Sequence, residues 1–434
     1  MTTFSPLLTR LTNHLTISDQ HLEQIAVSFT QAIEDGLTEK SSPLKMLPSY
    51  LAKPTGQETG IYLALDFGGT NVRVLLIELL GQGRSDVRVR SCQPLQDYLS
   101  PHTSAEALFN AIAAAIGRLA PPGVVCYLGH TFSFPSRQQS INHAVLLDWT
   151  KEIKAAGMEG RNVNQLLQEA LIRCRFPNVI PKAILNDTAG TLLTGAFQHP
   201  STDIGSICGT GHNTAYLESH SPLTGQPMIL NLESGNFDQL PVTYYDIILD
   251  KTSDNPGRQR LEKMASGRYL GELLRLIATD LFPEVMARAK PGQPLATPYA
   301  LTSEDITRLL SDHTPALDDI SDWLNDRLKL PNSSLKQRTA LKQIAGLLIA
   351  RSARMIAATY LGILRHIDPE CSSPHAIAID GSLYEKIPGY AQTIRAALAA
   401  ALGEQAEQVT VNLVKDGSGI GAAIAAAIAV KSEA

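Results

Sequence analysis

The chain has 434 residues, of which 44% are hydrophobic and 18% are charged, a composition typical of a soluble globular protein. Its length exceeds the size at which a single hydrophobic core usually stops growing, so we expect two domains. The formal net charge of −5 and the lack of any dense Lys/Arg cluster in the sequence argue against a nucleic-acid-binding protein.

The cysteines and the apolar runs indicate the cellular location of the protein. The 5 cysteines are scattered and form no CxxC pair, so a disulfide framework or a zinc site is not expected. The longest apolar run, residues 420–430, is short and rich in alanine, and the N-terminal residues do not resemble a signal peptide. We therefore expect a cytoplasmic protein without a membrane anchor, either a monomer or a homodimer.

The first predicted element is a helix. Ser18 is placed to cap it, and apolar residues recur at helical spacing until Gly36, which is expected to end it. Residues 1–59 are therefore predicted to form one helix and a connector. Further along, the pattern predicts strands through 61–135 with one helix, then alternating helices and strands; the helices are expected near 104–119, 162–173, 188–197 and 337–367, and strands at 182–185, from 204, and at 376–382.

Two glycine-rich turns are the most informative feature of the sequence. They read DFGGTNVRV at 66–74 and ICGTGHNTAY at 207–216, and apolar runs flank each of them. This pattern predicts two β-hairpins rather than P-loops. Glycine in these turns would permit a positive φ and a close approach of phosphate to the backbone, whereas the alternative is an ordinary hairpin turn.

A single Asn-Asp-Thr segment, residues 186–188, lies between the two turns in the sequence. A sugar hydroxyl is a weak nucleophile, so a carboxylate within reach can accept its proton as a phosphoryl group arrives. Asp187 is the candidate for that general base, because it follows a predicted strand and precedes a predicted helix. The alternative is that Asp187 only caps the helix.

Longer motifs show a resemblance to a known family. The repeated hairpin is the arrangement of the actin-like sugar kinases and ATPases, and the chain resembles the hexokinase family in ordered motifs that cover nearly its whole length: KMLPSYL at 45–51, the sugar-binding signature at 128–154, NDTAGTLLTGAF at 186–197, EKMASGRYLGELLRLI at 262–277 and DGSGIGAA at 416–423. The resemblance implies an α/β fold of the two-domain actin-like ATPase (ribonuclease H-like) type, with mixed sheets flanked by helices and an interdomain cleft.

The resemblance also implies domain boundaries and a reaction. Residues 1–59 would pack on a large domain of residues 187–418, and residues 60–186 with the C-terminal helix 419–434 would form a small domain. The reaction would be transfer of the γ-phosphoryl group of Mg-ATP to the 6-hydroxyl of glucose, with mannose and fructose as further substrates, as in the first step of glycolysis. Asp187 and Lys151 would be the catalytic residues.

By the same resemblance, polar side chains would hold the sugar hydroxyls. The implied sugar-binding residues are Ser133, Pro135, Thr150, Lys151, Asn186, Asp187, Asn213, Glu233, Gln259 and Glu262. The implied ATP-binding residues are Asp66, Gly68, Gly69, Thr70, Asn71, Arg73, Gly209, Thr210, Gly211, Gly417 and Ser418. No direct protein ligand is expected for Mg²⁺, which Asp66 would hold through a water. Taken singly, Lys151, Glu233 and Glu262 could instead be solvated surface residues.

Three positions depart from the family pattern. Glu152 stands where glycine is usual, His212 where serine is common, and Ser234 where an aromatic residue often follows the sugar-binding glutamate. For His212 a packing role is favoured over proton transfer. Two alternatives remain open, a kinase for another sugar and a hexose-binding sensor that transfers phosphate poorly. The presence of Asp187, Lys151, Thr210 and both glycine turns favours the enzyme.

Overall fold

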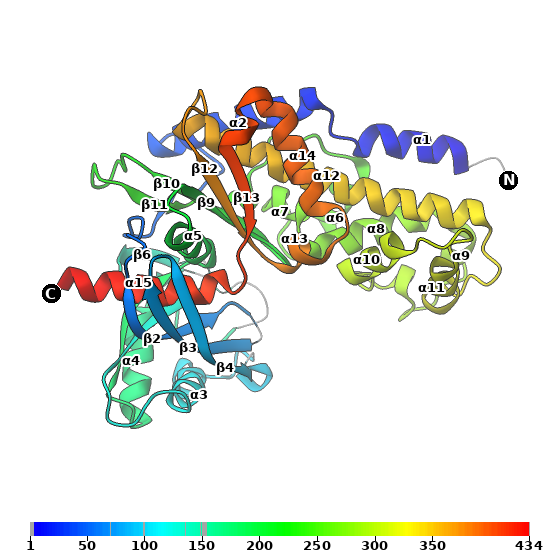
Figure 1. Ribbon diagram of the computed structural model, residues 1–434. Coiled ribbons are helices and arrows are strands. Elements are labelled where there is room, and N and C mark those ends of the chain that lie inside the picture. The colour runs from blue at the N-terminus through cyan, green and yellow to red at the C-terminus, as the bar shows by residue number, and fades with distance from the viewer. Residues whose placement is uncertain are drawn as a thin grey trace.

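The structure is a computed structural model that describes residues 4–69, 71–98, 100–134, 136–147, 149 and 154–433. Two large mixed sheets form its centre, one in each half of the molecule (Figure 1). The five-stranded sheet has the order β4 (Arg84–Pro94), β3 (Asn71–Gly81), β2 (Thr59–Phe67), β5 (Cys126–Phe132) and β8 (Val179–Leu185). The six-stranded sheet has the order β1 (Leu47–Pro48), β11 (Met228–Asn231), β10 (His212–Glu218), β9 (Thr202–Cys208), β12 (His375–Asp380) and β13 (Val409–Leu413).

Both glycine-rich turns join antiparallel strands, so the prediction of two hairpins is confirmed. β2 pairs with β3, and β9 pairs with β10. In each sheet the first strand of the hairpin also has a parallel neighbour, β5 for β2 and β12 for β9. A third, small sheet follows β5 and consists of two strands, β6 (Ser136–Ser140) and β7 (His143–Leu146). The two halves of the chain therefore repeat one strand arrangement.

Helices cover both faces of the five-stranded sheet. Leu63 and Leu65 of β2 pack in one apolar cluster with α3 (Ala105–Gly117) and α4 (Val163–Arg173). Ala64, on the opposite face, packs in another cluster with α5 (Asp187–Gln198) and α15 (Gly417–Glu433). A strand buried on both faces needs a continuous apolar run, which explains residues 63–65 of β2, whereas Ile61 is 55% exposed. In Figure 1, α5 and α15 lie between the two halves of the molecule.

The remaining helices build the largest apolar cluster around the six-stranded sheet and the long helix α12. They are α1 (Phe4–Leu15), α2 (Asp19–Leu37), α6 (Tyr244–Thr252), α7 (Arg260–Ala265), α8 (Gly267–Leu281), α9 (Pro283–Met286), α10 (Ser303–Ser311), α11 (Asp318–Leu328), α12 (Leu335–Ile367), α13 (Ser382–Lys386) and α14 (Tyr390–Leu402). Within the described residues, α12 alone is long and apolar enough to cross a membrane, but 83% of its apolar window is buried inside the protein.

The N-terminal region differs from the sequence prediction in two ways. Two helices are present where one was expected, because Leu11 and Leu15 of α1 are buried in the same cluster as α12. Ser18 caps α2 as predicted, accepting a hydrogen bond from His21 N at 3.1 Å. However, α2 continues through Gly36 rather than ending there. A Cβ at Gly36 would lie 2.5 Å from Cγ of Met46, so this glycine provides room for the connector.

The contact between α5 and α15 leaves no room for side chains. A Cβ at Gly421 would lie 2.0 Å from the carbonyl oxygen of Gly190, and a Cβ at Gly190 would lie 2.9 Å from the carbonyl oxygen of Ser418. Because the obstacles are backbone atoms, neither clash can be relieved by a rotamer change. We expect Gly421→Ala to lower the free energy of unfolding by about 3 kcal/mol, at the upper end of ordinary overpacking costs.

Gly346→Ala is the matched control for that prediction. A Cβ at Gly346, in the interior of α12, would meet its nearest atom, Cδ2 of Leu310, at 3.9 Å. Replacing a helix-interior glycine without a clash should raise stability by up to about 1 kcal/mol. Urea unfolding of both variants measures the difference, and equal midpoints for Gly421→Ala and the wild type would contradict the packing argument.

Candidate active site

The glycines of the two turns do not have the conformation that the sequence predicted. A positive φ was expected at these glycines, and that expectation is wrong. None of the four has one: Gly68, Gly69, Gly209 and Gly211. Limited space accounts for two of them. A Cβ at Gly68 would lie 3.2 Å from Oγ of Ser133 and a Cβ at Gly211 would lie 3.1 Å from Oε2 of Glu262, whereas a Cβ at Gly69 would meet no described atom within 4 Å. No described neighbour in the protein requires glycine at position 69, and its backbone is open to the close approach of a ligand.

Asp66 lies at the end of β2, in contact with two other predicted ATP-binding residues. Its carboxylate pairs with Arg73 from β3 and accepts a hydrogen bond from Ser418 Oγ at 3.2 Å. Burial raises the pKa of Asp66, the Arg73 guanidinium acts in the opposite direction, and the nearby Asp187 carboxylate raises the pKa further. The structure thus brings a buried carboxylate, a cation and the start of α15 together.

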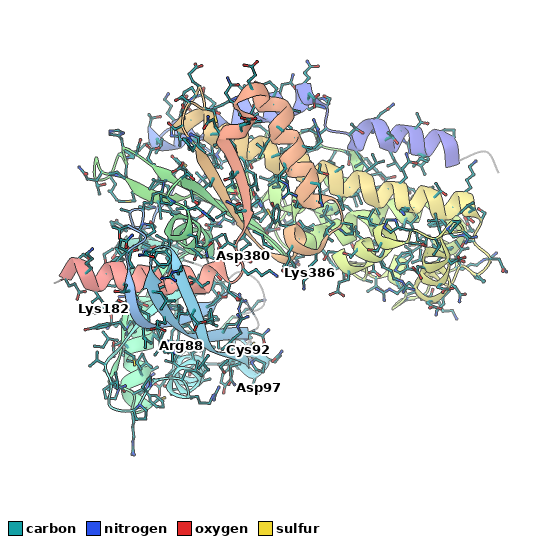
Figure 2. All side chains as sticks on the ribbon, in the orientation of Figure 1. Arg88, Cys92, Asp97, Lys182, Asp380 and Lys386 are labelled. Carbon is teal, nitrogen blue, oxygen red and sulfur yellow. The ribbon has the colours of Figure 1, made fainter. Side chains whose placement is uncertain are left out.

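A second acidic group lies on the same side of the site. Asp380, at the end of β12, accepts a hydrogen bond from Gly417 N at 2.9 Å and lies where the two halves of the molecule meet (Figure 2). Burial raises the pKa of Asp380 to about 6. Arg73 also lies 3.6 Å from Asp416, which in turn pairs with Arg90. The predicted nucleotide-binding segment at Gly417 is therefore joined to strands of both sheets. Gly417 N bonds to Asp380 of β12, and Asp416 lies beside Arg73 of β3 and Arg90 of β4.

Asp187 is the first residue of α5 but does not cap it. The cap is Asn186, whose Oδ1 accepts from Thr188 N at 2.9 Å and from Thr188 Oγ1 at 2.6 Å. Among the described residues, Asp187 Oδ1 accepts a hydrogen bond only from its neighbour Thr188 N, at 2.9 Å, and its side chain is partly exposed. Since Asn186 performs the capping role, capping alone does not account for an aspartate at 187.

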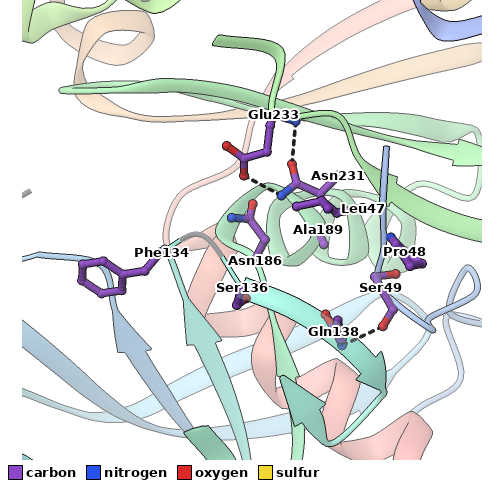
Figure 3. A pocket seen from close by; sticks show the side chains of 10 residues that line it. All are labelled: Leu47, Pro48, Ser49, Phe134, Ser136, Gln138, Asn186, Ala189, Asn231 and Glu233. Carbon is purple, nitrogen blue, oxygen red and sulfur yellow. Dashed lines mark hydrogen bonds between the residues drawn. The ribbon is translucent and has the colours of Figure 1, made fainter. Parts of the chain in front are cut away.

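Asn186, Asn213 and Glu233 belong to one hydrogen-bonded network. Asn213 Nδ2 lies 3.3 Å from Oε1 of Glu233 and 3.5 Å from Oδ1 of Asn186. Asn231 completes the network: its Nδ2 donates to Glu233 Oε1 at 2.8 Å, and its Oδ1 accepts from Asn213 at 2.9 Å and from Glu233 N at 3.1 Å (Figure 3). The sequence reasoning missed Asn231, whose position two residues before Glu233 was the only available signal.

Glu262 and Gln259 approach the site from α7. Glu262 Oε2 accepts a hydrogen bond from His212 N at 3.1 Å, directly beside Gly211. Gln259, the residue before α7, has a left-handed φ of 53° and accepts a hydrogen bond from Asn255 Nδ2. Glu262 is thus joined to the second glycine turn, while Gln259 is held by its own loop.

A small polar pocket lies between the two halves of the molecule (Figure 3). Its lining residues are Leu47, Pro48, Ser49, Phe134, Ser136, Gln138, Asn186, Ala189, Asn231 and Glu233. Gln138 Nε2 lies 2.9 Å from the carbonyl oxygen of Ser49 and 2.7 Å from that of Ile184, so it joins the N-terminal connector to β8. Gln138 was also missed, because a glutamine that contacts backbone carbonyls belongs to no short motif.

The other predicted residues divide into two groups. Ser133 N donates to the carbonyl oxygen of Phe67 at 3.2 Å, so Ser133 lies beside the first glycine turn, and Thr210 accepts from Arg268 N at 3.0 Å through its carbonyl oxygen. Asn71 is the first residue of β3. The remaining predicted residues lie outside the described part of the chain: Thr70, Pro135, Thr150 and Lys151, together with the departing Glu152.

No group of three or more His, Cys, Asp or Glu side chains that could hold a metal occurs among the described residues. In a kinase site, Mg²⁺ tends to keep several waters and to bind substrate phosphates rather than a complete protein cage. Asp66 fits an outer position in such a site, because a nearby cation would offset the cost of charging its buried carboxylate.

Two glycine hairpin turns, the neighbouring carboxylates of Asp66 and Asp187, and a pocket bordered by amide and carboxylate side chains are the features of a phosphotransferase that acts on a polyhydroxy substrate. Profiles described as hexokinase match residues 7–197 and 203–428. Hexokinase-7 of Oryza sativa subsp. japonica is 38% identical over 94% of this chain and 93% of its own length.

Solved structures agree with the sequence relatives. A structure described as hexokinase has a TM-score of 0.87 at 30% identity and covers 99% of this chain and 100% of its own. The hexokinase from Schistosoma mansoni complexed with glucose has a TM-score of 0.85 at 32% identity and covers 98% of this chain and 100% of its own. The chain belongs to the hexokinase family. It is a single catalytic unit with the two-domain fold that the sequence predicted, and it is an ATP-dependent hexose kinase.

The network around Asn231 generates a prediction. Asn231→Leu keeps the side-chain volume but removes the donor to Glu233 Oε1 and the acceptor for Glu233 N. We expect the KM for hexose to rise on the order of 10- to 100-fold, the equivalent of one hydrogen bond to a charged group, with the KM for ATP unchanged.

Asn178→Leu is the control, since Asn178 donates to the carbonyl oxygen of Val124 at 2.7 Å at the outer edge of the five-stranded sheet. Initial-rate kinetics with each substrate varied in turn measure both constants. An unchanged hexose KM in Asn231→Leu would exclude Asn231 from the sugar site.

Proposed function

We propose that this hexose kinase phosphorylates the 6-hydroxyl of glucose, and also accepts mannose and fructose. The observation that carries the proposal is a hydrogen-bonded network that borders the pocket. It consists of Asn186, Asn213, Asn231 and Glu233, and Asn186 directly precedes Asp187 in the sequence. Amide and carboxylate groups held in fixed directions suit a ligand that presents several hydroxyls, because each can donate to or accept from one or two of them.

Asp187 is the proposed general base. Its carboxylate is partly exposed and, within the described part of the chain, accepts a hydrogen bond only from the backbone of Thr188, so its second oxygen can accept the proton of a sugar hydroxyl. Its place at the N-terminus of α5 stabilises the negative charge that a base requires. Lys151, which lies outside the described residues, remains a predicted second catalytic residue.

Mg²⁺ is the proposed metal, held by the substrate phosphates and, through a water, by Asp66. When bound, it would neutralise charge that develops on the phosphate oxygens. Arg73 supports the same end of the site, because its guanidinium pairs with Asp66 and lies 3.6 Å from Asp416. Glu233 would then approach the sugar from one side, and the glycine turns would approach the phosphates from the opposite side.

The same reasoning supports the wider assignments. We propose that residues 60–186 with 419–434 form a small domain that closes on residues 187–418, with residues 1–59 on the large domain. Closure would exclude the water that otherwise hydrolyses ATP. We further propose a cytoplasmic enzyme of glycolysis that acts as a monomer or homodimer and binds neither nucleic acid nor membrane. A kinase for another sugar and a catalytically weak hexose sensor are the alternatives, and a panel of hexoses separates them.

Asp187→Asn tests the proposed base. The amide keeps the size of the side chain and an oxygen for Thr188 N but cannot accept the proton. We expect kcat to fall on the order of 10²-fold or more while glucose binding, followed by calorimetry, is retained. Asp319→Asn is the control, because Asp319 is an exposed aspartate in the first turn of α11. Turnover near that of the wild type in Asp187→Asn would remove Asp187 from the base role.

Asp66→Asn tests the metal assignment. We expect EDTA to abolish ADP release by the wild type, and the Mg²⁺ concentration for half-maximal activity to rise about 10-fold or more in the variant, as when an outer partner of a metal is lost. Asp86→Asn, on β4 with a side chain that is 61% exposed, should leave it unchanged. The same Mg²⁺ dependence in Asp66→Asn and the wild type would reject the outer-position role of Asp66.

A further inference from the structure

Two residues that depart from the hexokinase pattern touch each other. Nε2 of His212 lies 3.3 Å from Oγ of Ser234, and both side chains are buried. The family commonly has a small serine at the first position and often an aromatic residue at the second. This chain therefore has a larger residue at one position and a smaller one at the other, and the two changes occupy adjoining space.

The ring of His212 is fixed at both nitrogens. Nδ1 lies 3.0 Å from the carbonyl oxygen of Ile207, which can only accept, so Nδ1 carries the hydrogen. Nε2 is then the acceptor for the hydroxyl of Ser234. Burial lowers the pKa of His212 to about 4, so the ring is neutral near pH 7. The favoured packing role agrees with this geometry.

The backbone of His212 holds one of the two candidate sugar-binding glutamates. His212 N donates to Oε2 of Glu262 at 3.1 Å. The short 3₁₀ helix Ser234–Asn236 packs on the same residues, since a Cβ at Gly235 would lie 3.1 Å from Cβ of Glu262 and 3.2 Å from the carbonyl oxygen of His212. A shift of His212 would therefore move the Glu262 carboxylate.

The side chain of His212 holds the residue that follows the other glutamate. Glu233 has a left-handed φ of 51°, a conformation that a non-glycine residue keeps only when its surroundings hold it there. Ser234 supplies two such restraints. Its N donates to Oδ1 of Asn213 at 3.1 Å, and its Oγ donates to His212. The hydroxyl of Ser234 therefore helps to fix the backbone from which Glu233 projects.

We propose that His212 and Ser234 form a positioning pair that sets the placement of Glu233 relative to Glu262, and thereby the hydroxyl pattern of the hexose that the site accepts. The inference rests on the proposed function, in which both glutamates bind sugar hydroxyls. His212 and Ser234 act on the sugar through the positions of the Glu233 and Glu262 carboxylates. Because a site built from directed hydrogen bonds discriminates strongly when one of them is misplaced, a small movement of either glutamate should alter the choice among epimers.

Two single variants and their double test the pair. Ser234→Ala removes one oxygen atom and leaves Nε2 of His212 without its donor. His212→Phe keeps a ring of similar size and removes both of its hydrogen bonds. We expect each single variant to raise the KM for glucose about 10-fold, with kcat within about threefold and the KM for ATP unchanged. The ratio of kcat/KM for glucose to that for mannose or galactose should change by about 10-fold.

The double variant removes both partners of the shared hydrogen bond, which costs less than leaving one buried partner unpaired. Its glucose KM should therefore be lower than the product of the two single effects predicts. His375→Phe is the matched control. His375 is another buried histidine, at the start of β12, and its ring nitrogens lie 2.7 Å from Oδ2 of Asp203 and 3.2 Å from Oδ2 of Asp368.

We expect His375→Phe to lower the thermal unfolding temperature without changing the epimer ratios. If Ser234→Ala and His212→Phe behave in the same way, the pair only fills space and the proposal is overturned. Failure of the proposed function would look different. Wild-type protein would release no ADP in response to glucose, or Glu233→Gln and Glu262→Gln would leave the hexose KM unchanged, whatever the two positioning variants do.

Discussion

The backbone contact between α5 and α15 is the constraint on which the rest of the structure depends. Gly190 and Gly421 meet with no space for a side chain, and a Cβ at Gly129 of β5 would lie only 1.8 Å from the carbonyl oxygen of Ala422. Contacts between backbone atoms cannot be adjusted by rotamers, so the distance of closest approach between the two helices is set, while rotation about that contact is available for the proposed closure. Since these helices lie between the two sheets (Figure 1), the fixed contact relates one sheet to the other.

Both helices begin at the active site. α5 starts with Asp187, and α15 starts with Gly417 and Ser418, whose hydroxyl reaches Asp66 at 3.2 Å. The relative position of the proposed base and the proposed phosphate-binding region therefore follows from how closely the two helices approach. Their N-termini also favour negative charge, which suits a site that binds a polyphosphate beside a catalytic carboxylate. Arg73 offsets part of the repulsion between Asp66 and Asp187.

Strong periodic patterns made most of the fold predictable. The two hairpins, the long helix α12 and the helix that follows Asn186 were expected from apolar runs and small-residue turns and are present. α1 was missed because it is short, and its buried leucines have meaning only against α12. The prediction of a positive φ at the turn glycines was wrong. A glycine that leaves open space, such as Gly69, cannot be told from the sequence apart from a glycine that has a positive φ.

Motifs pointed to residues that the fold brings together. Asn186, Asn213 and Glu233 are far apart in sequence and meet in one network, and their binding of sugar stays a prediction. Asn231 and Gln138 could not be found in that way, because their partners are created by strand pairing and by backbone carbonyls of distant segments. The contact between His212 and Ser234 was likewise invisible, since the sequence showed two separate departures and only the structure shows one pair.

The most direct test of the account is ADP release from Mg-ATP in the presence of glucose, 6-deoxyglucose or no sugar. The two sugars present the same ring hydroxyls to the polar network, but only glucose offers a 6-hydroxyl from which Asp187 can accept a proton. The account predicts rapid ADP release with glucose alone, and competitive inhibition of that release by 6-deoxyglucose. Equal release with 6-deoxyglucose, or release that is independent of any sugar, would contradict phosphoryl transfer to the 6-hydroxyl.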